Sequence, residues 1–286
     1  MIEDKPKGLR AHLPFIYPAV MLVVFFVISF GIMVTVSFFH RVPGAFYTPS
    51  FDLNNYRNLF TALFGRVLVF SIFIAALCAA VCVAIGFPFT YFITRMRRKA
   101  QVVWLVILVS VLSLSTVIIA FAWSLLLSKT AGLSNLFVWL GFMERPVSWS
   151  PGFWALLCGM CYIAFPYTVL VLYPPLSRLD PYLPEAAMTL GASPVKTFFS
   201  VVVGSMHSAI MATLIVVFAF TLGTYLLPQI LGRPQHWTLS VLITDEAIYH
   251  SNLPFSAAMA VFFMLVSLGL IAFTMMIGKG RGPKQR

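Results

Sequence analysis

The sequence predicts an all-α, polytopic membrane protein with six transmembrane helices. Of its 286 residues, 60% are hydrophobic and only 9% are charged, whereas a soluble domain usually carries about 25% charged residues. A soluble globule of this composition would expose large apolar patches, which lipid tails solvate and water does not. The composition therefore excludes a water-soluble enzyme, and the length accommodates about six spans of roughly 20 residues each.

Six runs without a charged residue are long enough to cross the hydrocarbon core as helices. They comprise residues 13–39, 67–94, 102–128, 153–173, 208–231 and 255–278. The first run is too long for the core of a signal peptide and lacks a cleavage site after it, so we expect it to remain as an uncleaved anchor. Together the runs form one predicted transmembrane domain, residues 13–278, with both termini on the same side.

Lysine and arginine are divided unevenly between the two sides of this topology. The side of the termini has thirteen, namely Lys5, Lys7, Arg10, Arg95, Arg97, Arg98, Lys99, Arg178, Lys196, Lys279, Arg281, Lys284 and Arg286, and the other side has six, namely Arg41, Arg57, Arg66, Lys129, Arg145 and Arg233. Cytoplasmic loops hold the excess of such residues, which predicts a cytoplasmic N-terminal tail (1–12) and a basic cytoplasmic C-terminal tail (279–286). These clusters lie beside apolar runs, which favours contact with anionic lipid head groups over nucleic acid.

The predicted spans contain no Asp, Glu, Lys or Arg. Ion-coupled carriers usually need such a buried group to bind and release the coupling ion. The chain also lacks the G-x-x-x-x-G-K-[ST] phosphate loop, so it is not itself a P-loop ATPase. If the protein moves a solute, the sequence indicates a non-enzymatic pore subunit that draws energy from a separate ATPase.

The sequence offers little for a metal or a cofactor. Four cysteines lie inside apolar runs, and the C-x-x-C spacing of Cys158 and Cys161 has only apolar neighbours, which favours helix packing over a metal or redox site. The five histidines lie in or next to loops without a carboxylate or cysteine at ligand spacing. We therefore expect no cofactor and no metal site.

The segment at residues 178–207, between the fourth and fifth runs, carries two helix-start signals. Asp180 can cap a first helix with Pro181 at its first position, and Ser193 can cap a second in the same way with Pro194. Gly191 suits the left-handed position that ends the first helix. The segment therefore predicts a helix-turn-helix at the cytoplasmic face.

Inside this segment, Glu185-Ala186-Ala187 followed by Gly191 resembles the EAA loop of type I, binding-protein-dependent ABC importer permeases. The family pattern continues to an aliphatic-Leu-Pro, and Gly204 stands here in place of the proline. Residues 55–60, 86–88 and 222–232 are similar to the spermidine/putrescine-type branch of this family, although Arg233 stands where a second glycine is common. The resemblance implies the type I ABC importer permease (MetI-like) fold in a bacterial inner membrane.

The resemblance also implies partners and site residues. One permease pairs with a homologous permease or a second copy, two ATPase subunits dock on the EAA loops, and an extracytoplasmic binding protein delivers the solute. The implied ATPase-coupling residues are Glu185, Ala186, Ala187 and Gly191; the solute-path residues are Phe220, Thr221, Thr224 and Tyr225; and the helix-breaking or gating residues are Gly86, Pro88, Gly223 and Pro228. A small-residue stripe, Ala76, Ala80 and Ala84, is typical of close helix contact.

Substrate identity stays open between several small polar organic solutes. A polyamine fits the branch, and the aromatic rings along the predicted path can attract a cation through their faces. Relatives of the same branch, however, also handle opines and phosphonates. Two other protein classes are weaker alternatives. A secondary transporter predicts a buried charge or an inverted repeat, and a membrane assembly protein has no use for an EAA loop.

Overall fold

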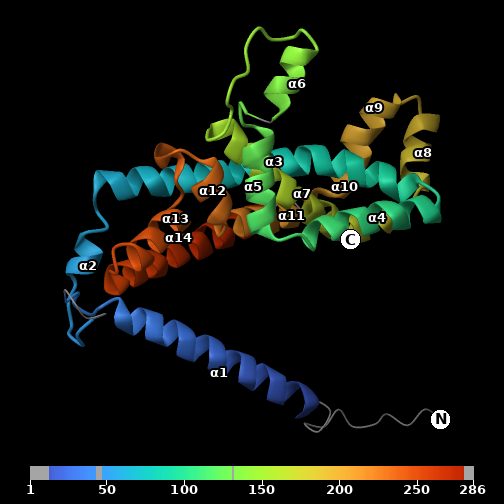
Figure 1. Cartoon of the computed structure of the whole chain (residues 1–286). Coiled ribbons are helices and arrows are strands. Elements are labelled where there is room, and N and C mark those ends of the chain that lie inside the picture. Colours follow the sequence, from blue (N-terminus) through green and yellow to red (C-terminus); the bar gives the residue numbers. More distant parts are fainter. Residues whose placement is uncertain (1–12, 43–46, 131, 280–286) are drawn as a thin grey trace, which may run out of the picture. The chain divides into compact units, whose positions relative to one another are not determined.

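The computed structural model describes residues 13–42, 47–130 and 132–279 (Figure 1). The predicted N-terminal tail, residues 1–12, and residues 280–286 of the predicted C-terminal tail lie outside the described residues. The regular elements of the described chain are helical, apart from one isolated bridge between His40 and Thr48. The contacts divide the chain into unit 1, residues 1–60 and 243–262, and unit 2, residues 61–242 and 263–286.

The helices in chain order are α1 (Leu13–Val36), α2 (Asn54–Arg57), α3 (Ala62–Arg95), α4 (Arg98–Leu112), α5 (Thr116–Leu126), α6 (Leu133–Trp139), α7 (Phe153–Ser177), α8 (Tyr182–Thr189), α9 (Pro194–Thr197), η2 (Phe198–Val202), α10 (Val203–Ser205), α11 (His207–Leu222), α12 (Leu226–Leu231), η3 (Pro234–His236), α13 (Leu239–Ile248) and α14 (Leu253–Lys279). Four helices, α1, α3, α7 and α14, are long and apolar enough to cross a membrane unbroken. Two further spans are bent pairs, which gives up to six crossings among the described residues.

In unit 1, side-chain hydrogen bonds hold together the segment that follows α1. The amide of Asn55 donates to the carbonyl oxygens of Ser37 and Phe39 at 3.0 and 2.9 Å. Asp52 accepts hydrogen bonds from the Asn54 backbone N–H and contacts His40, and these interactions hold the pKa of Asp52 below its usual value. These contacts tie Asp52 to both Asn54 and His40 in the segment that follows α1.

Unit 2 is built around α3, which packs against α7 and α11. Thr61 begins α3 by accepting the N–H of Phe64 at 3.3 Å. The 34 residues of α3 extend about 50 Å at 1.5 Å per residue, which exceeds the roughly 30 Å of a hydrocarbon core. The helix therefore projects beyond the membrane, and its C-terminal end lies beside α8 and α9 (Figure 1).

Small residues line the seam where α3 meets α7. Ala75 and Ala79 are buried, and a Cβ built on Gly86 would lie 2.8 Å from Cγ2 of Thr168. The two backbones therefore approach each other as closely as they do because position 86 has no side chain. The stripe predicted from sequence, Ala76, Ala80 and Ala84, lies on a neighbouring face of α3 that is exposed in this chain.

The structure corrects two predicted spans. Residues 102–128 do not form one helix, because α4 and α5 meet at 93° across a break at Ser113–Ser115. Residues 208–231 are also divided: α11 ends at Leu222, and α12 starts at Leu226 after a non-helical link. Hydropathy marks both runs correctly as apolar, but it carries no information on where a helix axis bends.

Candidate functional site

The first helix of the predicted coupling loop is α8. Asp180 begins it as expected, since its carboxylate accepts the backbone N–H of Tyr182 at 2.9 Å. The assigned helix begins at Tyr182, one residue after the predicted first position at Pro181. Because Pro181 has no N–H to satisfy, the first available donor of the turn is the one that Asp180 caps.

Gly191 ends α8 in the left-handed conformation, with φ of +88°. Its N–H donates to the carbonyl oxygen of Met188 at 3.0 Å, and the N–H of Ala192 donates to the carbonyl oxygen of Ala187 at 3.1 Å. This pair of bonds is the Schellman motif, in which glycine avoids the steric cost of a Cβ at positive φ. The turn predicted at Gly191 is therefore present.

The second helix starts where the sequence predicts. Ser193 accepts the N–H of Lys196 at 3.3 Å, and Pro194 occupies the first helical position. The chain then passes through the π-helical turn η2 and the short α10 before a 71° bend leads into α11. The bend lies at Met206, two residues beyond Gly204.

The motif residues form an open surface on this helix pair. Glu185 and Ala186 are exposed and Ala187 is half-buried, whereas Pro184 beneath them is buried. Leu190, at the end of α8, is 88% exposed. A slim alanine face next to an exposed leucine is a surface on which another protein can pack closely.

Beneath the helix pair lies an apolar groove of about 770 Å³. Phe87 and Pro88 of α3 form one wall, and Met188, Thr197 and Phe198 form the other. The rings of Phe87 and Phe198 lie 5.7 Å apart between centroids. Among the described residues, the buried hydroxyl of Thr197 has no hydrogen-bond partner. The contact between Phe87 and Phe198 therefore joins the predicted coupling loop to the end of α3 that the sequence predicts to be cytoplasmic.

The four predicted solute-path residues lie at the end of α11 and in the link that follows. Thr221 is buried, and its hydroxyl donates to the carbonyl oxygen of Val217 at 2.9 Å and lies 3.5 Å from that of Ala75 on α3. Thr224 likewise donates to the carbonyl oxygen of Phe220 at 3.2 Å. Tyr225 is 39% exposed, so the two threonines are engaged with backbone while the tyrosine ring is open.

Phe220 has an aromatic partner that the sequence did not single out. The ring of Tyr167 on α7 lies 4.4 Å from that of Phe220 between centroids, at an interplanar angle of 45°. Tyr167 follows Pro166 in an apolar run, but only the packing of α7 on α11 brings it to Phe220. The pair presents aromatic faces beside the link that holds Tyr225.

Of the four predicted helix-breaking positions, only Gly223 coincides with a break. α3 continues without interruption through Gly86 and Pro88, so the prediction that these residues break the helix is wrong. Gly86 instead permits the close approach to Thr168. α11 ends at Gly223, whereas Pro228 lies buried in the first turn of α12, where proline does not disrupt a helix.

Similarity to known proteins extends over most of the chain. It is 27% identical over 252 residues to the spermidine/putrescine transport system permease protein PotB of Escherichia coli K12, covering 87% of this chain and 90% of that protein. PotB of Haemophilus influenzae is 26% identical over 251 residues, and the inner membrane ABC transporter permease protein YdcU of Escherichia coli is 27% identical over 247. No protein-family model matches.

A solved bacterial ABC transporter involved in the import of the acidic polysaccharide alginate superposes with a TM-score of 0.77 over 96% of this chain and 97% of that chain. The chain has the fold of an ABC importer permease. At 16% identity this likeness concerns the fold alone. A solved bacterial alginate ABC transporter in complex with an alginate pentasaccharide-bound periplasmic protein also superposes on this chain, at a TM-score of 0.74. The predicted ABC importer permease fold is confirmed. The predicted resemblance to the spermidine/putrescine branch is confirmed as well.

Proposed function

We propose that the chain is the permease subunit of an ATP-driven, binding-protein-dependent importer of a small polar organic solute, most simply a polyamine. The observation that carries this proposal is the exposed Glu185–Ala187 helix, closed by Gly191 and seated on α3. A helix that only connected two spans would need neither an open alanine face nor a groove against a long transmembrane helix. The names of the similar permeases support the same function.

The helix pair provides a mechanical route from an ATPase to the pore. A push on α8 reaches η2, against which α8 packs, and passes from Phe198 of η2 to Phe87 of α3, whose ring centroids lie 5.7 Å apart. The same push reaches α11 along the chain, through α9, η2 and α10. Because packed helices move as rigid bodies rather than deform continuously, movement of this pair rocks α3 and α11 together.

The proposed partners are those that the resemblance to type I ABC importer permeases implies. For a chain with one EAA loop, these are two ATPase subunits and a second permease, either a homologue or another copy. An extracytoplasmic binding protein delivers the solute. The excess of lysine and arginine on the side of the coupling loop supports the proposal that the loop and both termini face the cytoplasm, in a chain that spans a bacterial inner membrane.

Aromatic rings support the choice of a cationic solute. The described spans contain no Asp or Glu, whereas Tyr167, Phe220 and Tyr225 offer ring faces. Such faces attract organic cations by about 0.5–2 kcal/mol each, which is weak enough for a solute to leave the site again. Opines and phosphonates remain the alternative solutes, because one permease fold serves different solutes.

The test is reconstitution with the ATPase, the second permease and the binding protein encoded beside this chain. Proteoliposomes with the parent chain should couple ATP hydrolysis to spermidine or putrescine uptake. Glu185→Lys should reduce both by at least about tenfold, because it reverses the charge of the proposed docking face and adds a longer side chain there. Glu144→Lys, on an exposed loop far along the chain, is the matched control and should keep normal uptake. Normal coupling in Glu185→Lys would contradict the proposed docking face.

A further inference from the structure

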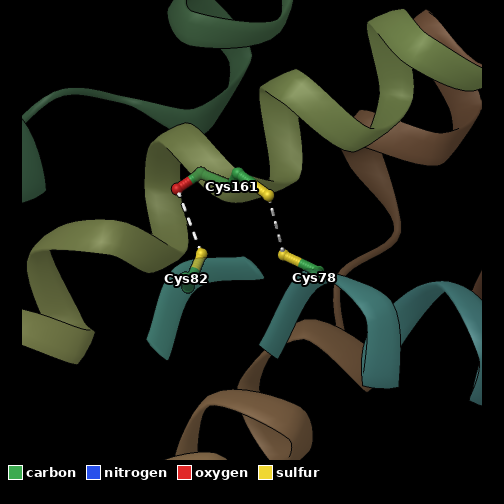
Figure 2. Close-up of side chains that lie close together, drawn as sticks. All are labelled: Cys78, Cys82 and Cys161. Carbon is green, nitrogen blue, oxygen red and sulfur yellow. Dashed lines mark hydrogen bonds between the residues drawn. The ribbon is translucent and has the colours of Figure 1, made fainter. Parts of the chain in front are cut away.

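Three cysteines from two helices meet inside unit 2. Figure 2 shows Cys78 and Cys82 pointing from α3 towards Cys161 on α7. The sulfur of Cys78 lies 3.6 Å from that of Cys161, and the sulfur of Cys82 lies 3.7 Å from the Cys161 carbonyl oxygen. All three sulfurs lie within 4.8 Å of one another.

The seam between α3 and α7 creates this cluster. Cys78 and Cys82 are four residues apart and therefore share one face of α3, next to the small residues Ala75 and Ala79. These small side chains, with Gly86 one turn further, allow α7 to approach closely enough for Cys161 to complete the triangle. Cys158, three residues before Cys161, is exposed and is not part of the cluster.

We propose that Cys78, Cys82 and Cys161 form a three-sulfur binding site for a monovalent soft cation, Cu(I). Metal–sulfur bonds of about 2.3 Å place the sulfurs of a trigonal site about 4.0 Å apart. The sulfurs here already approach that spacing, so binding requires side-chain adjustment rather than movement of the helices. Soft thiol and thiolate ligands select Cu(I) over harder cations.

Charge balance favours a monovalent ion over Zn²⁺ at this depth. Binding of Cu(I) to one thiol breaks one S–H bond and forms one S–Cu bond, and the released proton leaves with the carrier or water that delivered the ion. The site then holds one thiolate, two thiols and one cation, with no net charge added. Zn²⁺ would require two thiolates and a fourth ligand, but residues 67–94 and 153–173 contain no His, Asp or Glu. Uncompensated charge is costly inside a membrane.

The burial of the three residues provides both a dry site and an entrance. Cys78 and Cys82 are fully buried, which excludes water and other ligands from the bound ion, whereas Cys161 is half-buried. The ion therefore enters from the side of Cys161 and is held between the helices. Bound in this way, it links α3 to α7 and stabilises their seam, because a ligand that binds only the folded state raises its stability.

The test measures Cu(I) retained by the full-length chain in detergent, in the presence of ascorbate and the chromophoric Cu(I) chelator bathocuproine disulfonate. The parent should retain about one Cu(I) per chain. Cys78→Ser and Cys82→Ser should each weaken retention by at least about tenfold. Cys158→Ser, which removes the exposed thiol outside the cluster, is the matched control and should retain as much Cu(I) as the parent.

Equal retention by the parent and Cys78→Ser, or loss of retention in Cys158→Ser, would overturn the proposal. X-ray absorption of the loaded parent provides a measurement that does not depend on whether a variant folds. A shell made only of sulfur around copper supports the site, and a shell containing nitrogen or oxygen overturns it. The unfolding temperature of the parent, but not of Cys78→Ser, should rise when Cu(I) is added.

Discussion

The backbone N–H of Ala192 donates to the carbonyl oxygen of Ala187 at 3.1 Å and thereby closes the coupling helix on itself. This bond fixes the direction in which the chain leaves α8 and so sets the angle between α8 and α9. It forms only because the intervening Gly191 has φ of +88°. The geometry of the proposed docking surface therefore depends on Gly191.

The first prediction concerns Gly191. Gly191→Ala should cost roughly 1–2 kcal/mol in the turn, and Gly191→Pro should abolish it, because proline can neither adopt positive φ nor donate to Met188. The subunit should still insert, but solute-stimulated ATP hydrolysis and uptake should fall together, more for proline than for alanine. Both are measured on the purified complex in proteoliposomes.

Gly204→Ala is the control for this prediction. No heavy atom lies within 4 Å of a Cβ at that position, and its φ is not positive, so transport should remain normal. Full coupling in Gly191→Pro would mean that the segment serves only as a connector.

The second prediction concerns the seam between α3 and α7. Gly86→Ala places a Cβ 2.8 Å from Cγ2 of Thr168, and overpacking of this kind costs about 1–3 kcal/mol, more than the roughly 1 kcal/mol gained in helix propensity. The unfolding temperature in detergent should therefore fall. Adding Thr168→Ser removes the clashing methyl group and should restore most of it.

For comparison, Gly269→Ala on α14 gains the same helix propensity, and no atom lies within 4 Å of its Cβ. Its unfolding temperature should equal or exceed that of the parent. If Gly86→Ala behaves like Gly269→Ala, the close approach at Thr168 is not a constraint on the fold.

The third prediction separates the aromatic from the hydroxyl groups of the proposed path. Tyr225→Ala and Phe220→Ala should each slow uptake of a polyamine by about 2- to 30-fold, the equivalent of one cation–π contact. Thr221→Val should have little effect, because its hydroxyl already donates to the carbonyl oxygen of Val217. Solute binding by the external receptor should be unchanged in all three variants. A severe defect in Thr221→Val with normal uptake in Tyr225→Ala would reverse this assignment.

The fourth prediction concerns orientation. In a version otherwise free of cysteine, a membrane-impermeant thiol reagent added to intact cells should label a cysteine at Asn58, Glu144 or Pro234, all of which are exposed. It should miss a cysteine at Lys99 or Ala192 until the membrane is opened. Labelling in the opposite pattern would invert the topology derived from the distribution of lysine and arginine.

Local signals in the sequence predicted the coupling loop well. The caps at Asp180 and Ser193 and the turn at Gly191 depend on residues within a few positions of each other, so the backbone chemistry could be derived from the chain alone. The six apolar runs could also be identified from the sequence. The prediction that each run forms one continuous helix was wrong for two of them. Neither the 93° bend at Ser113–Ser115 nor the break between α11 and α12 changes the hydropathy of its run.

Contacts between distant segments could not be derived. Cys161 meets Cys78 across 83 positions of the chain, and Tyr167 meets Phe220 only through the register of α7 against α11. If one helix slid by one turn along its neighbour, every such contact would join different residues. The spacing of residues within one helix therefore does not predict contacts between helices. The packing of α3 also explains why Ala75 is buried whereas Ala76 is exposed.

We propose that this chain passes a polyamine-like solute across the membrane, driven by ATP that another subunit hydrolyses. The most direct measurement is uptake of radiolabelled spermidine and putrescine into proteoliposomes that contain the chain, its partner permease and its ATPase, with the binding protein outside and ATP inside. Polyamine should accumulate inside the proteoliposomes only when ATP, the ATPase and the binding protein are all present. Accumulation driven by an ion gradient without the ATPase would contradict this proposal.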